Sequence, residues 1–155
     1  MIDFSKIEQY RENNRIEAKK ALGGLPKSIW ETYSAFANTE GGLILLGVIE
    51  QADKSFAPVP LRDIQWLMDE FWLQLGLPGT VSVDILTQDD VFIQQSEGKR
   101  ILVIAVPPAP AHLRPVYVGA DPYTGSYYRS GEADLRMDRA QVDAMLGRRL
   151  QPHTP

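Results

Sequence analysis

The chain has 155 residues, a formal net charge of -4 and 44% hydrophobic residues, with a sequence isoelectric point near 5.2. This length suits one domain with its own core, and the acidic balance gives no overall electrostatic reason to expect a polyanion as partner. Because cysteine is absent, disulfides, thiolate zinc sites and cysteine nucleophiles are excluded. No apolar run approaches the length of a membrane helix, so the sequence predicts a soluble cytoplasmic protein without a membrane partner.

The charge is unevenly distributed along the chain. Residues 1–39 hold six Lys/Arg and five Asp/Glu, residues 40–97 hold two and ten, and residues 98–155 hold eight and five. The ends therefore carry +1 and +3 around a middle of -8. This pattern allows a local basic face but excludes a strongly basic groove.

The first elements are read from apolar spacing. Residues 2–7 suit either a short helix or an extended arm, and the pattern does not decide between them. Alternation over 15–22 predicts a half-exposed strand. Apolar residues then recur at helical spacing from Ile29 to Ala37, after Pro26, and predict a helix with a buried aromatic face.

A polar hinge, Asn38 to Gly42, follows this helix. Asparagine and glycine adopt the left-handed conformation that ends helices, and the run "GGLILLGV" then predicts a strand that is apolar on both faces. We therefore expect a buried helix to turn directly into a buried central strand. Residues 61–76 predict a second helix, in which Trp66 and Trp72 offer a candidate dimer surface.

The second half predicts mostly strands. Residues 81–88 and 90–97 predict a hairpin or meander, and residues 100–107, apolar on both faces, predict a central strand. Residues 114–119 and 125–131 predict two short strands around the turn "ADPYTG". A last helix over 138–150 begins with Asp138 as its N-cap.

Together these elements predict one α+β domain over residues 1–150, followed by a disordered tail, 151–155. Its sheet is mixed and largely antiparallel, with five to six strands packed against about three helices.

Several blocks resemble a known family when they are taken in order. They are "ENNRIEAKK", "SAFANTEGGLILLGV", "RILVIAVPPA", "RPVYVG" and "GSYYRSGEAD", and they cover roughly residues 11–146. This order is similar to that of the Schlafen AlbA-like domain, whose usual form departs from this chain at Ala18, where it commonly has Phe. The resemblance implies a nucleic-acid-binding domain of the kind found in bacterial transcriptional regulators and in Schlafen proteins.

The resemblance also implies a candidate metal site. Glu12 and Glu17 look similar to two carboxylates that bind a divalent metal in RNA-cleaving Schlafen proteins, and a third acid after the central strand would be Glu50 or Asp53. We prefer Glu50, which directly follows the strand. Clustered carboxylate oxygens suit Mg²⁺ or Mn²⁺. A structural interpretation competes with this one, because Glu17 also suits a solvated strand face where it pairs with a neighbouring cation.

Candidate phosphate-binding residues lie near both ends of the chain. Arg11, Arg15, Lys19 and Lys20 form the densest basic stretch, and Arg114 and Arg129 from the late strands extend it. Tyr117, with Tyr127 and Tyr128, offers rings on which unpaired bases can stack.

Three functions follow as hypotheses. The first is a nucleic-acid-binding domain, of a transcriptional regulator, that contacts DNA or RNA weakly and mainly through phosphates, without a cofactor. The second is a ribonuclease that uses Mg²⁺ or Mn²⁺ at Glu12, Glu17 and Glu50, so the sequence leaves open whether the protein is an enzyme. The third is an interaction module or homodimer.

Overall fold

A mixed sheet of four strands forms the centre of the computed structural model, which describes residues 2–150. The strand order is β1-β2-β6-β5; β1 and β2 are parallel, and the other neighbours are antiparallel. The bounds are β1 Ile16–Lys19, β2 Gly42–Leu46, β5 Val91–Ser96 and β6 Lys99–Val106. Two small antiparallel sheets pair β3 Val48–Glu50 with β4 Phe56–Pro58, and β7 Tyr127–Ser130 with β8 Ala133–Arg136.

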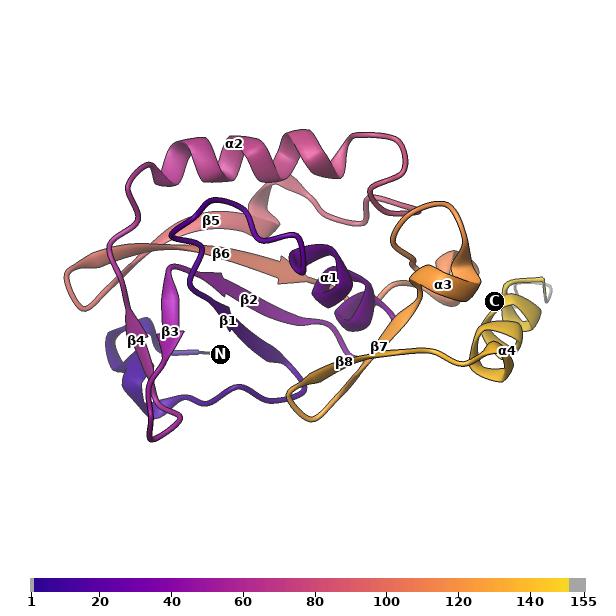
Figure 1. The fold of residues 1–155 in the computed structure, drawn as a ribbon, viewed down its shortest axis with the longest axis horizontal. Coiled ribbons are helices and arrows are strands. Elements are labelled where there is room, and N and C mark those ends of the chain that lie inside the picture. Colours follow the sequence, from indigo (N-terminus) through magenta and orange to yellow (C-terminus); the bar gives the residue numbers. More distant parts are fainter. Residues whose placement is uncertain (1, 151–155) are drawn as a thin grey trace.

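The helices lie around this sheet. The α-helices are α1 Ile29–Ala37, α2 Ile64–Leu75, the single turn α3 Pro122–Gly125, and α4 Arg139–Arg149. Short 3-10 helices are η1 Phe4–Gln9, η2 Gln88–Asp90 and η3 Ala111–Leu113. Figure 1 shows α2 running along β5 and β6, and α4 at the end of the molecule away from β3 and β4.

The central strands are buried on both faces because their side chains alternate between two apolar clusters. On one face Ile44 and Leu46 join α1 and α2 in the larger cluster. On the other, Leu45 packs with Ile7 of η1 and Phe56 of β4. Side chains of a strand point alternately to the two faces, so a continuous aliphatic run such as "LILL" fits only a sheet covered on both sides. The predicted central strands are confirmed.

The hinge between α1 and β2 is held by Asn38. Its Nδ2 donates to the carbonyl oxygens of Val116 and Tyr127, both at 2.9 Å, and its Oδ1 accepts from the Val116 N–H at 2.7 Å. The left-handed conformation falls on Gly41, with φ +74°, whereas Asn38 stays in the right-handed region. The hinge therefore ends the helix and also ties it to the segment around Val116 and to β7.

The strand predicted over 81–88 is wrong. Within these residues the structure has coil apart from an isolated bridge between Val81 and Val118 and the start of η2. The backbone groups of Val83 and Ile85 bond instead to the hydroxyl of Tyr33 on α1, at 2.9 and 3.0 Å. A buried side chain therefore takes the place of a partner strand, and β5 pairs with β6.

The late strands are partly as predicted. Residues 125–131 do contain β7, but its partner is β8, which the sequence pattern did not reveal. Residues 114–119 make only isolated bridges, of which one joins Tyr117 to Ser126. The turn "ADPYTG" contains α3, whose N-cap Asp121 accepts from the Tyr123 N–H.

The fold class is confirmed as α+β in a single compact domain, although its strands divide among three sheets. The predicted final helix is α4, and Asp138 caps it together with Gln141. The tail predicted to be disordered, 151–155, lies outside the described residues. Within residues 2–150 no helix has the length and apolar character needed to cross a membrane.

Replacing Asn38 with Ala tests the hinge. The variant removes three hydrogen bonds: the buried Val116 N–H loses its partner, the Tyr127 carbonyl loses one donor, and the Val116 carbonyl keeps only the Ser34 hydroxyl. A buried group left without its partner costs about 1–3 kcal/mol. We expect the free energy of unfolding, measured in urea, to fall by roughly 2–4 kcal/mol with the m-value unchanged. The control is Glu40→Ala at an exposed hinge position. Equal stability of the two variants would contradict this role.

Candidate metal centre

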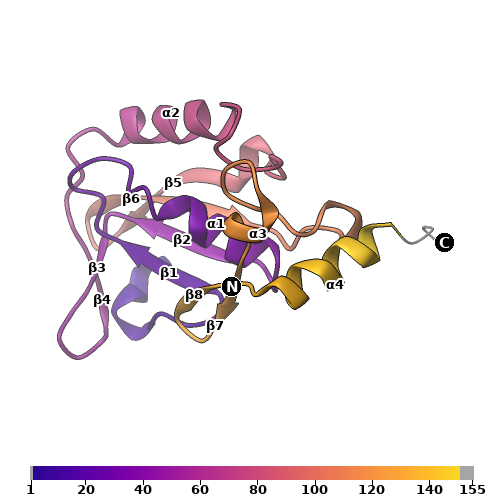
Figure 2. The same ribbon diagram turned by 45° about the vertical axis from the view of Figure 1, so that its right-hand side comes forward.

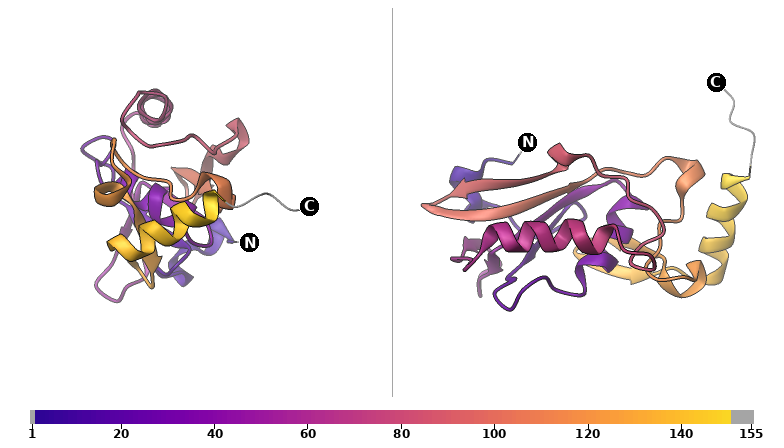
Figure 3. Two further views of the ribbon diagram at one scale, coloured as in Figure 1. Left: turned by 90° about the vertical axis from the view of Figure 1, so that its right-hand side faces the viewer. Right: turned by 90° about the horizontal axis from the view of Figure 1, so that it is seen from above.

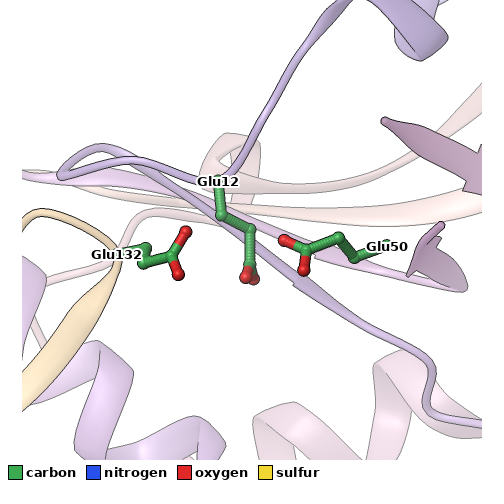
Figure 4. Close-up of side chains that lie close together, drawn as sticks. All are labelled: Glu12, Glu50 and Glu132. Atoms are coloured by element: carbon green, nitrogen blue, oxygen red, sulfur yellow. The ribbon is translucent and has the colours of Figure 1, made fainter. Parts of the chain in front are cut away.

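Three carboxylates from distant parts of the chain converge at one place. One oxygen from each of Glu12, Glu50 and Glu132 lies within 4.8 Å of the others (Figure 4). Glu12 lies between η1 and β1, Glu50 ends β3, and Glu132 lies in the turn between β7 and β8. We call these three residues the carboxylate cluster.

A glycine between β2 and β3 allows Glu50 to reach the cluster. Gly47 has φ +90°, and a Cβ built there would meet the Leu61 side chain at 2.8 Å. Its N–H donates to Lys19 of β1 and its carbonyl accepts from Val59, so the chain leaves the central sheet at this point. Only glycine adopts this conformation without strain. The chain then continues as β3 and ends at Glu50, half-exposed and 3.4 Å from Lys54 Nζ.

Glu12 is the most perturbed member of the cluster. Its Oε2 accepts a hydrogen bond of 3.0 Å from the Ala18 N–H of β1. Burial and, after it, the neighbouring carboxyls of Glu17 and Glu50 together raise the pKa of Glu12 to about 8, against the lowering effect of the Ala18 N–H. At neutral pH this carboxyl therefore holds a proton unless a cation replaces it.

Glu17 lies beside the cluster but is neutralised within the protein. Its Oε1 is 2.8 Å from the Arg129 guanidinium, and its Oε2 is 4.0 Å from Lys19 Nζ. The structure therefore places the predicted acids Glu12, Glu17 and Glu50 close together, with Glu17 on the arginine side. Asp53, the other candidate for the third acid, is fully exposed and accepts from the backbone and hydroxyl of Ser55, which lower its pKa.

Glu132 was missed by the sequence analysis. It lies inside the block "GSYYRSGEAD", in a glycine-containing turn whose composition indicates only a loop. Its position depends on β8, which had not been predicted.

Arg129 is a correction to the predicted phosphate-binding set. Its side chain has no exposed surface, so it cannot meet a phosphate in solution. The guanidinium bonds the carboxylates of Glu17 and Asp134 and the carbonyls of Asn13 and Ile16, and lies 4.9 Å from the centre of the Phe36 ring. It is a structural cross-link beside the cluster.

The other predicted cations differ in exposure. Arg11, Arg15 and Lys20 are exposed, near the cluster in sequence. Lys19 is largely buried, and its Nζ donates to Ser28 Oγ at 3.0 Å. Arg114 lies far along the chain, half-buried, next to η3.

The predicted stacking rings are half-buried. The Tyr117 N–H is bonded to Ser82, the Tyr127 hydroxyl donates to Glu31, and Arg136 lies over the Tyr127 ring. The structure therefore leaves each of these rings only partly accessible to a base.

The donor set fits a hard divalent cation. Mg²⁺ binds carboxylate oxygens at about 2.0–2.1 Å, so its ligand atoms lie about 3–4 Å apart. The oxygens of the carboxylate cluster, within 4.8 Å of one another, reach that spacing after small side-chain rotations. Glu12, Glu50 and Glu132 are therefore the residues that would hold such an ion.

Comparisons with known proteins agree with the fold. The chain resembles the N-terminal domain of a Nitrosomonas europaea protein named as related to the ATP-dependent DNA helicase RecG, at 30% identity and a TM-score of 0.64, over 88% of this chain and 94% of that one. It also resembles the DIP2311 protein of Corynebacterium diphtheriae at 22% identity and a TM-score of 0.57, over 91% of this chain and 25% of that one. No curated protein matches.

The family model described as Schlafen, AlbA_2 matches residues 12–138, which include every member of the carboxylate cluster. The chain belongs to the Schlafen AlbA_2 family.

Proposed function

We propose that this chain is a nucleic-acid-binding domain that contacts the phosphate backbone at the carboxylate cluster with the help of a divalent cation. The observation that carries the proposal is the convergence of Glu12, Glu50 and Glu132 from three separate segments. The family membership, and the helicase-related name of the Nitrosomonas europaea protein, support a nucleic acid as the partner.

Electrostatics explains why a cation is needed. Glu12, Glu50 and Glu132 would repel a phosphate, and the exposed pair between Glu50 and Lys54 contributes little. A divalent cation held by the cluster would lower its charge from -3 to -1 and could bind a phosphate oxygen directly, while the exposed Arg11, Arg15 and Lys20 would neutralise flanking phosphates. Transcriptional regulation is the narrower form of the proposal, with duplex DNA as the partner.

A second candidate function is hydrolysis of an RNA phosphodiester at the same cluster. The observation that favours it is the Glu12 carboxyl, which exchanges its proton near neutral pH within a group of acids. A bound Mg²⁺ or Mn²⁺ would stabilise the charge on the attacked phosphate and lower the pKa of its water. Glu12, Glu50 and Glu132 would hold that ion, and Arg129 fixes Glu17 beside them.

Binding is tested by fluorescence polarisation. Short fluorescein-labelled RNA and DNA, single- and double-stranded, are titrated with the protein at two salt concentrations, with Mn²⁺ or with EDTA. We expect binding to weaken with salt. On duplex DNA, the logarithm of the binding constant should fall with the logarithm of the salt concentration with a slope of about -0.9 per neutralised phosphate. Binding should be tighter with Mn²⁺ than with EDTA. Arg15→Glu should weaken binding, whereas Arg62→Glu, on the surface before α2, is the matched control.

Absence of binding to every probe at low salt would reject the proposal.

Sedimentation velocity on the same samples tests self-association through α2, where Trp66 is 52% exposed while Trp72 is half-buried. A monomer at all concentrations would exclude the homodimer.

Cleavage is tested with end-labelled tRNA and Mn²⁺. If the cluster cleaves RNA, Glu12→Gln and Glu50→Gln should each lower the rate by about 100-fold or more, because each removes one of the charges that hold the ion. Asp53→Asn is the matched control, since this exposed acid lies near Glu50 in sequence but outside the cluster. Equal rates in Glu50→Gln and Asp53→Asn would place the reaction elsewhere.

The raised pKa of Glu12 predicts a pH-dependent stability. The group ionises near 4.5 in the unfolded chain and near 8 in the folded protein, so the folded state loses stability as the pH rises through this window. Glu12→Gln removes this effect. We expect the free energy of unfolding of the variant to rise relative to that of the wild type as the pH increases from about 5 to about 9. The difference should be about 1 kcal/mol after allowance for solvent screening of a half-exposed group.

Urea unfolding at several pH values measures the difference. Mn²⁺ at the alkaline end should stabilise the wild type and close the gap, because the cation replaces the proton. Parallel stability profiles of the two proteins across this pH range would contradict the assignment.

A further inference from the structure

Three arginines meet where the end of α4 packs against the segment after η3. We propose that Arg114, Arg148 and Arg149 form a second phosphate-binding site, which holds the backbone of a nucleic acid away from the carboxylate cluster. This inference rests on the proposed nucleic-acid-binding function. Arg148 and Arg149 were not among the residues predicted from the sequence.

Arg149 is held in place by backbone carbonyls. Its Nε donates to the Arg114 oxygen at 2.9 Å, and its terminal NH2 nitrogen donates to the oxygens of Leu113 and Pro115 at 2.8 and 3.1 Å. A guanidinium has five N–H donors in a fixed plane, so donors remain on the other terminal nitrogen. The group is therefore ordered before any ligand arrives.

Arg114 is ordered in the same way. Its Nε donates to the Ala109 oxygen at 2.8 Å, and its NH2 nitrogen donates to the Thr39 oxygen at 3.0 Å. Arg148 directly precedes Arg149 in α4, and partial burial together with the charge of Arg148 lowers the pKa of Arg114. Like charges held together favour an anion between them.

These arginines lack carboxylate partners among residues 2–150. The ion pairs there join Lys19, Lys54 and Arg129 to acids, and none involves Arg114, Arg148 or Arg149. Arg129 gives the contrast, because two carboxylates and backbone carbonyls enclose its guanidinium completely. Most Lys and Arg of the described residues likewise lack an acid within ion-pair distance, so the distinguishing feature of this group is the fixed orientation of the Arg114 and Arg149 guanidinium groups, which suits an anionic ligand.

The position of α4 gives a nucleic acid access to the site. Figures 2 and 3 show α4 extending from the body of the domain, and Figure 1 places it at the opposite end from β3, which carries Glu50. Planar guanidinium groups bind phosphate oxygens through two parallel hydrogen bonds. Because their orientation is already fixed, little side-chain entropy is lost on binding.

The test uses the full chain and the labelled RNA and DNA probes, in EDTA so that the carboxylate cluster does not contribute through a cation. Arg148→Glu is the main variant, because Arg148 is exposed and no hydrogen bond or ion pair holds it within residues 2–150. We expect its Kd to rise by about tenfold. The slope of log binding constant against log salt concentration should fall in magnitude by about 1, which corresponds to one phosphate contact. The matched control, Arg100→Glu on β6, should change Kd less than about twofold.

The outcomes separate this inference from the proposed function. Binding that persists unchanged in Arg148→Glu, while Arg15→Glu weakens it, overturns the second site and leaves the proposed function standing. No binding by the wild type in EDTA overturns the second site alone, and no binding with Mn²⁺ as well overturns both. A labelled poly-glutamate peptide is the competing ligand, and tighter binding of that peptide than of any nucleic acid overturns the inference in favour of an acidic protein partner.

Discussion

The buried guanidinium of Arg129 is the interaction on which the site depends. Its side chain has no exposed surface, so its positive charge must be paired inside the protein. The carboxylates of Glu17 and Asp134 form the two ion pairs. Bonds to the Asn13 and Ile16 carbonyls tie β7 to the segment that carries Glu12 and to the first central strand. Leaving such a group without partners costs about 3–5 kcal/mol, so the position of the hairpin is strongly fixed.

This cross-link also determines which acids remain available. Glu17 and Asp134 are committed to Arg129, so they add little negative charge to the surface. Glu12, Glu50 and Glu132 face one another without such a guanidinium, and burial together with the neighbouring carboxyls of Glu17 and Glu50 raises the pKa of Glu12. The protein thus neutralises one group of carboxylates and leaves the adjacent group to a proton or a cation.

The sequence predicted well wherever burial alone decides the structure. The aliphatic runs of β2 and β6 fit only a covered sheet. The resemblance pointed to Glu12 and Glu17, and the position after the strand pointed to Glu50; the structure places these acids close together. It failed where one distant side chain replaces a strand partner, as Tyr33 does for residues 81–88. Arginine usually indicates surface, so the burial of Arg129 became visible only once its two acids, 112 and 5 residues away in sequence, were in place.

Net charge describes this protein poorly, because its charges act locally. Figure 1 shows β3, which ends at Glu50, and α4, which carries Arg148 and Arg149, at opposite ends of the domain, so an overall value of -4 averages separate groups of charges. At physiological ionic strength the Debye length is about 8 Å, so a ligand at one surface is largely screened from the other. Under the proposed function, the acids with their cation and the arginines of α4 would therefore act on a polyanion as two separate contacts.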